Sequence, residues 1–277
     1  MCFSKWFAIP EHDQDEFPEE GKKKMALVFN INNYPGTEND LRGCLNDGED
    51  LLWKLDDEFP GFLIKRFKDS EATVKAFKTE MRNAVALLVP GDDLLVHYSG
   101  HGTYTYDESG DEADGYDEAI CLYDGIVIDD DIGDILMSIP DGATVLLLFD
   151  SCFSGTVTRA FGNPNKKSIF PWRNHPTKNR FMDPKLPPRK KKRIRFTKEE
   201  MKWVVISGCG EHQTSADAYI NRRYNGAFTH YALLTLTPGI TYRQWHERIR
   251  KYLPSDQFDQ IPMLEGKESL LDKLVLT

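Results

Sequence analysis

Residues 145–155 read Val-Leu-Leu-Leu-Phe-Asp-Ser-Cys-Phe-Ser-Gly, an apolar run that ends in a polar triplet and a serine–glycine turn. Five consecutive large apolar residues before a polar break are typical of a short strand buried on both faces of a parallel sheet. Ligands of open parallel sheets bind beyond the carboxyl ends of the strands, where Asp150, Ser151 and Cys152 fall. Side chains alternate along a strand, so Asp150 and Cys152 should project to the same side. The sequence therefore predicts a carboxylate and a thiol at the rim of one crevice.

A second apolar run ends in a histidine. Residues 93–99 read Asp-Leu-Leu-Val-His-Tyr-Ser, and Gly100, His101 and Gly102 follow. A histidine between two glycines after a strand lies on a tight turn whose backbone is open to a ligand. Because a cysteine thiol with a pKa of ~8.5 is mostly protonated at neutral pH, a nearby imidazole is its usual activator. Taken alone, His101 would be a turn residue and Cys152 a small buried residue, but two such strand ends favour a reactive pair.

Apolar strands alternate with amphipathic helices along the rest of the chain. We expect strands at 25–31, 62–67, 93–99, 145–149 and 203–207, and helices at 39–57, 74–88, 132–137, 228–236 and 241–252. The last helix carries the capping-box pair Thr241 and Gln244 and is stopped by Pro254. This alternation predicts an α/β sandwich with a mostly parallel sheet.

The chain divides around a stretch without periodicity. Residues 163–200 are rich in proline and carry a basic run at 185–198, which predicts an exposed linker. Residues 1–24 are expected to form a flexible, mostly acidic leader. The segment at 25–162 holds both reactive residues, and the segment at 201–277 is expected to complete the same domain.

Composition narrows the class of protein. The chain has 277 residues, 40% hydrophobic and 12% aromatic, which suits a soluble globular protein. The net charge of −9 argues against nucleic-acid binding, and no apolar window approaches the ~18 residues of a membrane helix. Five cysteines without a Cys-x-x-Cys pair favour free thiols in a reducing compartment. We therefore expect a cytoplasmic monomer without nucleic-acid or membrane partners.

Several separate motifs, in one order along the chain, resemble those of metacaspases, which are caspase-like cysteine peptidases. Two are the segments around His101 and Cys152. The others are Asn32–Thr37, Leu41–Asp47, Gly110–Glu118, Ile206–Cys209 and Gly226–Thr229. The Gln-Ala-Cys-Arg-Gly signature of aspartate-cutting caspases is absent. The resemblance implies a caspase-like three-layer α/β sandwich, with large-subunit-like and small-subunit-like regions on either side of the linker.

The resemblance also implies catalytic roles. Cys152 would be the nucleophile and His101 the general base of a cysteine endopeptidase. The backbone N–H groups of Gly102 and of Cys152 itself would form the oxyanion hole, where a side chain in place of glycine would crowd the developing charge. The remaining histidines and Cys209 are interpreted as structural or surface residues.

Family resemblance places Asp47, Asp150 and Cys44 in the pocket for the residue before the scissile bond. Two carboxylates that converge in a cleft suit a guanidinium or an ammonium group. The expected substrates are therefore proteins or peptides with Arg or Lys at this position. The simpler interpretation is a solvated carboxylate for Asp47 and a strand-end residue that caps nearby amides for Asp150.

No cofactor is required by this chemistry, but a calcium site is a candidate. Asp124, Asp129 and Asp130 resemble the calcium ligands of the family, and dense carboxylates suit this ion. Arg159 stands where the family often supplies another aspartate, and a cation there opposes metal binding. The sequence leaves calcium open. Zinc at His97 and His101 lacks a third ligand of suitable spacing.

Two alternatives to a constitutively active protease remain. One is a catalytically silent caspase-like module that binds or regulates a partner, and the other is a zymogen. Because the inferred pocket is acidic and the linker basic, the sequence predicts self-cleavage between Lys185 and Lys198, with a second candidate site at Lys22–Lys24. Alternatively, the basic run binds an acidic loop or partner and is never cut.

Overall fold

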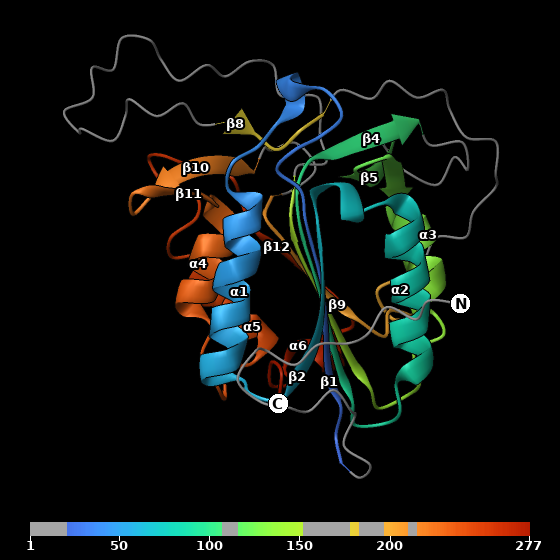
Figure 1. The fold of residues 1–277 in the computed structure, drawn as a ribbon. Coiled ribbons are helices and arrows are strands. Elements are labelled where there is room, and N and C mark those ends of the chain that lie inside the picture. Colours follow the sequence, from blue (N-terminus) through green and yellow to red (C-terminus); the bar gives the residue numbers. More distant parts are fainter. Residues whose placement is uncertain (1–20, 107–115, 152–177, 183–196, 210–214) are drawn as a thin grey trace.

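A six-stranded sheet in the order β12-β9-β7-β3-β1-β2 forms the centre of the molecule (Figure 1). The computed structural model describes residues 21–106, 116–151, 178–182, 197–209 and 215–277. The strands are β1 Lys24–Asn30, β2 Phe62–Lys68, β3 Asp93–Ser99, β7 Thr144–Asp150, β9 Val204–Ser207 and β12 Met263–Glu265. All neighbours in this sheet are parallel except β12, which runs antiparallel to β9. The predicted, mostly parallel sheet is confirmed, and strands from both sides of the linker belong to it.

Helices cover both faces of the sheet. They are α1 Cys44–Glu58, α2 Val74–Leu87, α3 Asp129–Leu136, α4 Ala227–Thr235, α5 Tyr242–Ile249 and the short α6 Glu268–Leu271. Alternate side chains of β1 enter the two cores: Ala26 and Val28 join the core with α1, α4 and α5, whereas Met25, Leu27 and Phe29 join the core with α2 and α3. The predicted three-layer sandwich is confirmed (Figure 1).

The strand ends expected to carry the site lie at one edge of the sheet. β3 and β7 pair in register, with Ser99 opposite Asp150, so His101 and Ser151 both leave the sheet at its carboxyl edge. Two three-stranded sheets lie above this edge (Figure 1). They are built from β4 Gly102–Tyr106, β5 Tyr116–Leu122 and β6 Gly125–Ile128, and from β8 Lys178–Asn179, β10 Ala216–Ile220 and β11 Arg223–Gly226.

The first helix begins later than its apolar spacing predicts. It starts at Cys44 instead of residue 39. The backbone N–H groups of Arg42 and Gly43 donate to the carboxylate of Asp217, at 3.0 and 2.8 Å. This contact with a residue far away in the sequence holds the preceding segment outside the helix, and local spacing carries no trace of it.

The other helices lie where the sequence predicts them, but some begin or end at other residues than predicted. α3 begins at Asp129, three residues earlier than predicted, because acidic residues suit the first turn of a helix. The capping box of α5 is confirmed, with reciprocal bonds between Thr241 and Gln244. α5 ends at Ile249, so Tyr252 lies beyond the helix to which the sequence assigned it.

Residues 178–180, inside the predicted exposed linker, include a strand and bury one side chain. Lys178 and Asn179 form β8, which pairs with β10, and the side chain of Arg180 is fully buried. Residues 163–177 and 183–196 of the linker lie outside the described residues. They include the predicted cleavage site at 185–198, except for Thr197 and Lys198. At the second predicted cleavage site, Lys24 already belongs to β1, so a protease cleft could bind it only after local unfolding.

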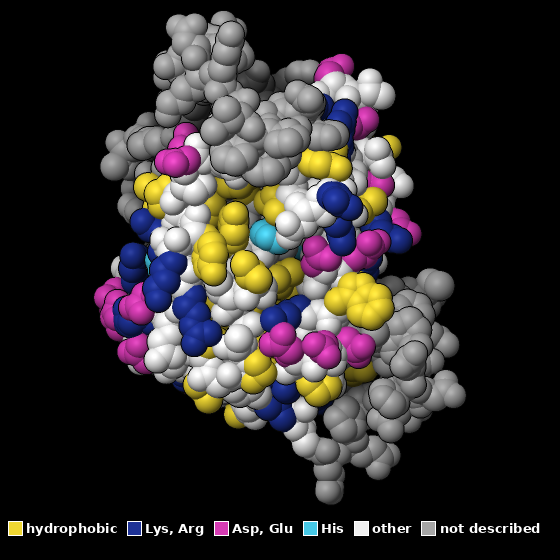
Figure 2. All heavy atoms as spheres, turned by 90° about the vertical axis from the view of Figure 1, so that its left-hand side faces the viewer, with side chains coloured by type: hydrophobic (Ala, Val, Ile, Leu, Met, Phe, Trp, Pro, Cys, Tyr) yellow, Lys and Arg dark blue, Asp and Glu magenta, His cyan; other side chains and the backbone are white. Residues whose placement is uncertain are grey.

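The surface of the described residues is mixed in character. On the face formed by α1, α4 and α5, a group of apolar side chains lies beside a histidine, and acidic and basic side chains surround it (Figure 2). Trp53 of α1 is 73% exposed. No helix in the described parts of the chain has the length and apolar character needed to cross a membrane. Cys44, Cys121 and Cys209 are buried free thiols, whereas Cys2 and Cys152 lie outside the described residues.

Candidate active site

His101 lies in the turn between β3 and β4, and its backbone is held on both sides. Its N–H donates to the hydroxyl oxygen of Tyr34 at 2.8 Å, and its carbonyl accepts from the hydroxyl of Tyr98 at 2.6 Å. Its ring Nε2 lies 2.7 Å from the carbonyl oxygen of Asn39. Because a carbonyl can only accept, Nε2 carries the hydrogen and Nδ1 keeps a lone pair. Nδ1 is buried and has no hydrogen-bond partner among the described residues.

The environment of His101 favours the neutral imidazole. Burial lowers the pKa of His101 to about 4, although the carbonyl of Asn39 opposes this shift. Above this pH the ring is uncharged and able to accept a proton at Nδ1. The geometry and the electrostatics together give an oriented base.

Cys152 lies outside the described residues, but the residue before it is placed. Ser151 is buried, and its carbonyl accepts from the thiol of Cys209 at 3.2 Å. The N–H of Gly208 donates to the carbonyl of Phe149 at 2.9 Å. Cys209, interpreted from the sequence as structural or surface, is thus buried and holds the strand end that leads into Cys152.

Asp47 and Asp150 converge on one guanidinium. Asp47 comes from α1 and Asp150 from the end of β7, and both are fully buried. Nη2 of Arg180 lies 2.8 Å from Asp47, and Nη1 lies 3.3 Å from Asp150. A third carboxylate, Asp217 of β10, lies 3.2 Å from Nη2. Ser99 joins the same cluster: its hydroxyl donates to Asp47 and accepts from Nη1 of Arg180, each at 2.7 Å. The structure therefore brings the two predicted carboxylates together in one pocket.

The walls of this pocket come from the segments that carry the family resemblance. The N–H of Gly226 donates to Asp47 at 2.8 Å, and both the N–H and the hydroxyl of Thr229 donate to Asp150. A Cβ atom at Gly226 would collide with the carboxylate of Asp150 and lie 2.7 Å from Nη1 of Arg180. The absence of a side chain at Gly226 is what leaves room for a guanidinium.

The charges in the pocket compete. Burial raises the pKa of Asp47 to about 6; Arg180 opposes this shift and Asp150 adds to it. Burial acts to lower the pKa of Arg180, but the surrounding acidic groups, led by Asp150, hold it well above its usual value. Three buried carboxylates around one guanidinium leave an excess of negative charge, which is costly without a cationic partner.

Cys44, the third predicted pocket residue, lies at the first position of α1 and is fully buried. Burial raises the pKa of its thiol well above the usual value, and the charges of Arg180, Asp217 and Asp47 all act on it. Cys44 therefore belongs to the surroundings of the pocket as an uncharged thiol.

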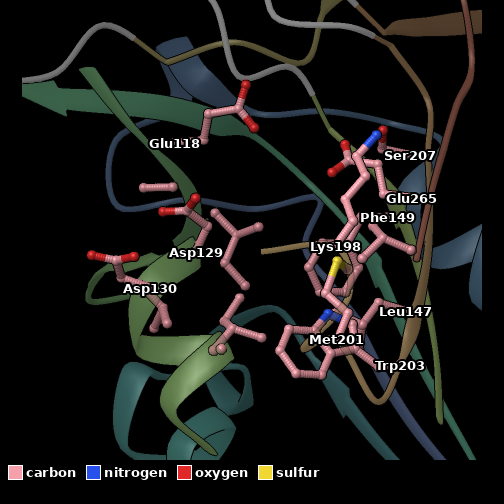
Figure 3. A pocket seen from close by; sticks show the side chains of 16 residues that line it. Glu118, Asp129, Asp130, Leu147, Phe149, Lys198, Met201, Trp203, Ser207 and Glu265 are labelled. Atoms are coloured by element: carbon pink, nitrogen blue, oxygen red, sulfur yellow. The ribbon is translucent and has the colours of Figure 1, made fainter. Parts of the chain in front are cut away.

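The predicted calcium ligands do not lie together. Asp129 and Asp130 line a pocket with Glu118 on one side, and Lys198 and Glu265 lie on the other (Figure 3). Asp124 lies in the turn between β5 and β6, where its carboxylate accepts from the N–H of Val74 at 2.7 Å. Within the described residues, no group of three or more His, Cys, Asp or Glu side chains is placed to hold a metal ion. The prediction of Asp124 as a ligand beside Asp129 and Asp130 is not supported, and neither is a zinc site.

Comparison with known proteins agrees with this architecture. The caspase-domain family matches residues 23–274. Metacaspase-1 of Schizosaccharomyces pombe is 30% identical, over 91% of this chain and 68% of its own, and Metacaspase-1 of Meyerozyma guilliermondii is 31% identical, over 88% and 69%. A crystal structure of a protein from Geobacter sulfurreducens superposes with a TM-score of 0.70 at 26% identity, over 92% of this chain and 98% of that one. The chain belongs to the caspase-domain family of cysteine peptidases, and the resemblance to metacaspases is confirmed.

Sequence reasoning missed Arg180 and Asp217. Arg180 is one of many basic residues in a stretch without periodicity, and nothing around it marks it as buried. Asp217 stands between two alanines in the short strand β10 and is buried. An acidic residue inside an otherwise apolar strand pattern, as in residues 216–220, was the one available signal.

Proposed function

We propose that this chain is a cysteine endopeptidase that hydrolyses peptide bonds after Arg or Lys, with Cys152 as nucleophile and His101 as general base. The observation that carries the proposal is a buried pocket of three carboxylates that holds a guanidinium next to an oriented neutral imidazole. Family membership supplies the reaction class, and the pocket supplies the substrate class.

The reaction needs only groups of the chain and water. Nδ1 of His101 accepts the proton of the Cys152 thiol, and the thiolate attacks the carbonyl carbon of the bound Arg or Lys. The N–H groups of Gly102 and Cys152 stabilise the oxyanion that develops. His101 then returns the proton to the leaving amine as the C–N bond breaks. Water, activated by the same imidazole, hydrolyses the thioester and regenerates the thiol.

Arg should be preferred to Lys. The carboxylates of Asp47 and Asp217 face one nitrogen of the guanidinium, and Asp150 and the hydroxyl of Ser99 face the other. A planar fork satisfies these acceptors together, whereas an ammonium is a single point charge. A side chain with a carboxylate is excluded, because it would add a like charge to an already acidic pocket.

The remaining expectations extend this proposal. The partners are protein or peptide substrates, the chain acts as a cytoplasmic monomer, and self-processing in the linker activates a latent form. The free thiols of Cys44, Cys121 and Cys209 support a reducing location. The proposed reaction uses no metal ion.

Turnover of fluorogenic peptides that end in Arg, Lys or Asp tests the proposal. Cys152→Ala and His101→Ala should each lower hydrolysis of Arg and Lys peptides by at least about 10³-fold, since the residual rate comes from binding and the oxyanion hole alone. His246→Gln is a matched control. Like Nε2 of His101, Nε2 of His246 is within hydrogen-bond distance of a backbone carbonyl oxygen, that of Pro262 at 2.8 Å, but His246 belongs to α5. Appreciable turnover by folded Cys152→Ala would refute the assignment and favour a silent module.

A further inference from the structure

The guanidinium in the acidic pocket belongs to the chain's own linker. Arg180 is fully buried, although it follows a stretch of sequence with no apolar pattern. Its two terminal nitrogens contact Asp47, Asp150, Asp217 and Ser99, and Nη1 also donates to the carbonyl oxygen of Asp150 at 3.2 Å. These partners come from four different elements, α1, β3, β7 and β10. Polar groups from four elements converge on this one side chain, as they do in a binding pocket.

The backbone of the same segment is bound as an added strand. β8 pairs antiparallel with β10, with Asn179 opposite Ala216 and Lys178 opposite Asp217. The N–H of Arg180 continues the pattern and donates to the carbonyl of Ser215 at 3.0 Å. Strand addition to a sheet edge is a general way to hold an extended peptide, with main-chain bonds for affinity and a pocket for specificity. Residues 178–180 meet both conditions.

The carbonyl group of Arg180 lies at the catalytic turn. Its oxygen accepts the N–H of Gly102 at 2.8 Å, and the N–H of Met182 donates to the carbonyl of Gly102 at 2.9 Å. Gly102 is the residue proposed to donate to the oxyanion, so the peptide bond that follows Arg180 occupies the position of a bond about to be cut.

From the pocket, the added strand and the contact with Gly102, we infer that Arg180–Phe181 is the bond that the enzyme cuts in its own chain, and that Arg180 blocks the pocket until then. The inference rests on the proposed function. It places the cut at Arg180, ahead of the run from Lys185 to Lys198 that charge alone suggested.

The cut itself follows the proposed reaction. The thiol proton of Cys152 passes to His101, sulfur bonds to the carbonyl carbon of Arg180, and the C–N bond to Phe181 breaks as its nitrogen takes the proton. Water then converts the thioester into a carboxylate on Arg180 and restores the thiol. The products are residues 1–180 and 181–277.

Cleavage weakens the hold on Arg180. The new carboxylate adds a negative charge beside an acidic pocket, and the chain end is no longer tethered on its carboxyl side. Arg180 can then leave, and peptides with Arg or Lys can enter. Before the cut, any such peptide competes with a group of the same chain at high effective concentration.

The experiment follows the intact chain and its fragments over time, with sequencing of every new N-terminus. Wild type should yield a fragment that begins at Phe181, and Cys152→Ala should stay intact. Arg180→Gln should slow this cut by about 100-fold or more, since it removes the charge that the pocket binds. Arg189→Gln is the matched control in the same linker and should be cut like wild type.

Latency is read in the same samples with an Arg peptide. Intact wild type should show a lag that ends as the fragment beginning at Phe181 appears, and folded Arg180→Gln should show no lag. Arg180→Lys keeps a positive charge in the pocket and is used if Arg180→Gln does not fold. This variant should be cut at the same bond, more slowly than wild type.

The outcomes separate the two proposals. Suppose that wild type hydrolyses Arg or Lys peptides. If no fragment then begins at Phe181, or if that fragment appears equally in Cys152→Ala, the inference about Arg180 is wrong and the proposed function stands. If no sample hydrolyses Arg or Lys peptides, even after the chain has been cut, the proposed function itself fails.

Discussion

Two acidic regions of this molecule differ in how they are made. Asp129, Asp130 and Asp131 are consecutive and form the first turn of α3. Asp47 and Asp150, together with Asp217, are far apart in the sequence and meet only in the folded chain. The consecutive cluster is the conspicuous one in the sequence, yet the dispersed set forms the site that holds a cation. The convergence of carboxylates in a buried space, more than their density along the chain, predicts a charge-specific pocket.

Burial explains the difference. Acidic residues in the first turn of a helix interact favourably with its backbone N–H groups, and Asp131 also pairs with Lys78 at 2.7 Å, so this partly exposed cluster has a structural role. In the pocket, Asp47 and Asp150 have no solvent exposure and depend on donors of the protein and on a cation. The two regions should therefore respond to the same substitutions very differently.

The largest effect is expected for Asp150. Asp150→Asn removes a charge that pairs with the guanidinium and disturbs the bonds from Ser215 and Thr229. Hydrolysis of Arg peptides should fall by a factor corresponding to about 2–5 kcal/mol. Asp131→Asn is the matched variant in the other region and should stay within about twofold of wild type, since Asp131 belongs to α3 and not to the carboxylates around Arg180. Equal losses in both variants would contradict the distinction; thermal unfolding checks that each is folded.

Asp47 sharpens the comparison through selectivity. Asp47→Asn keeps an oxygen for the N–H of Gly226 but removes one carboxylate from the cation. The ratio of kcat/KM for Arg peptides to that for neutral peptides should fall by about 10- to 100-fold, because the incoming charge is less well paired. An unchanged ratio would remove Asp47 from the specificity pocket.

The dependence on pH separates the regions further. Since burial raises the pKa of Asp47 to about 6, Arg peptides should be cut less efficiently as pH falls through about 6, where Asp47 takes up a proton. The contribution of Asp47 to the free energy of unfolding has the opposite dependence on pH. It is fully present below the ordinary pKa of an aspartate, about 4, and is lost as pH rises through about 6. Asp47→Asn should lose both trends between pH 4 and 6, as seen in kcat/KM and in the free energy of unfolding; persistence of both would assign them to another group.

The smallest effect is expected for calcium. Because Asp124 is engaged with Val74 and Arg159 stands where the family often supplies an acidic ligand, binding at Asp129 and Asp130 should be weak or absent. Calorimetry at about 1 mM calcium should show no saturable heat, and a chelator should not change peptide turnover. Tight binding that disappears in Asp129→Asn would show that these carboxylates find their further ligands elsewhere in the chain.

Much of the fold could be predicted because local patterns determine it. Each buried strand of the parallel part is a run of apolar residues, as at 145–149, and the helices end at caps or prolines that the sequence shows. The strands of the two smaller sheets and the edge strand β12 were not predicted, because most of them have two to five residues, too few for a periodicity to be recognised.

The site was predicted in part, for a different reason. His101 and Asp150 follow apolar strands, so their position at the sheet edge could be inferred. Arg180 and Asp217 take their roles from contacts with residues between 30 and 175 positions away, such as Asp150, Asp47 and Arg42. No property of the neighbouring sequence encodes such a contact, and only the folded chain reveals it.

The pairing of β8 with β10 also has a consequence for the proposed cleavage after Arg180. As long as residues 178–179 lie on β10, the backbone groups on that side of the strand are occupied. Departure of this segment leaves an open strand edge, and open edges pair readily with any extended chain that reaches them. If the chain is cut after Arg180 as proposed, this edge can receive a strand from a second copy as readily as a substrate, so the cut form should self-associate more readily than the intact chain.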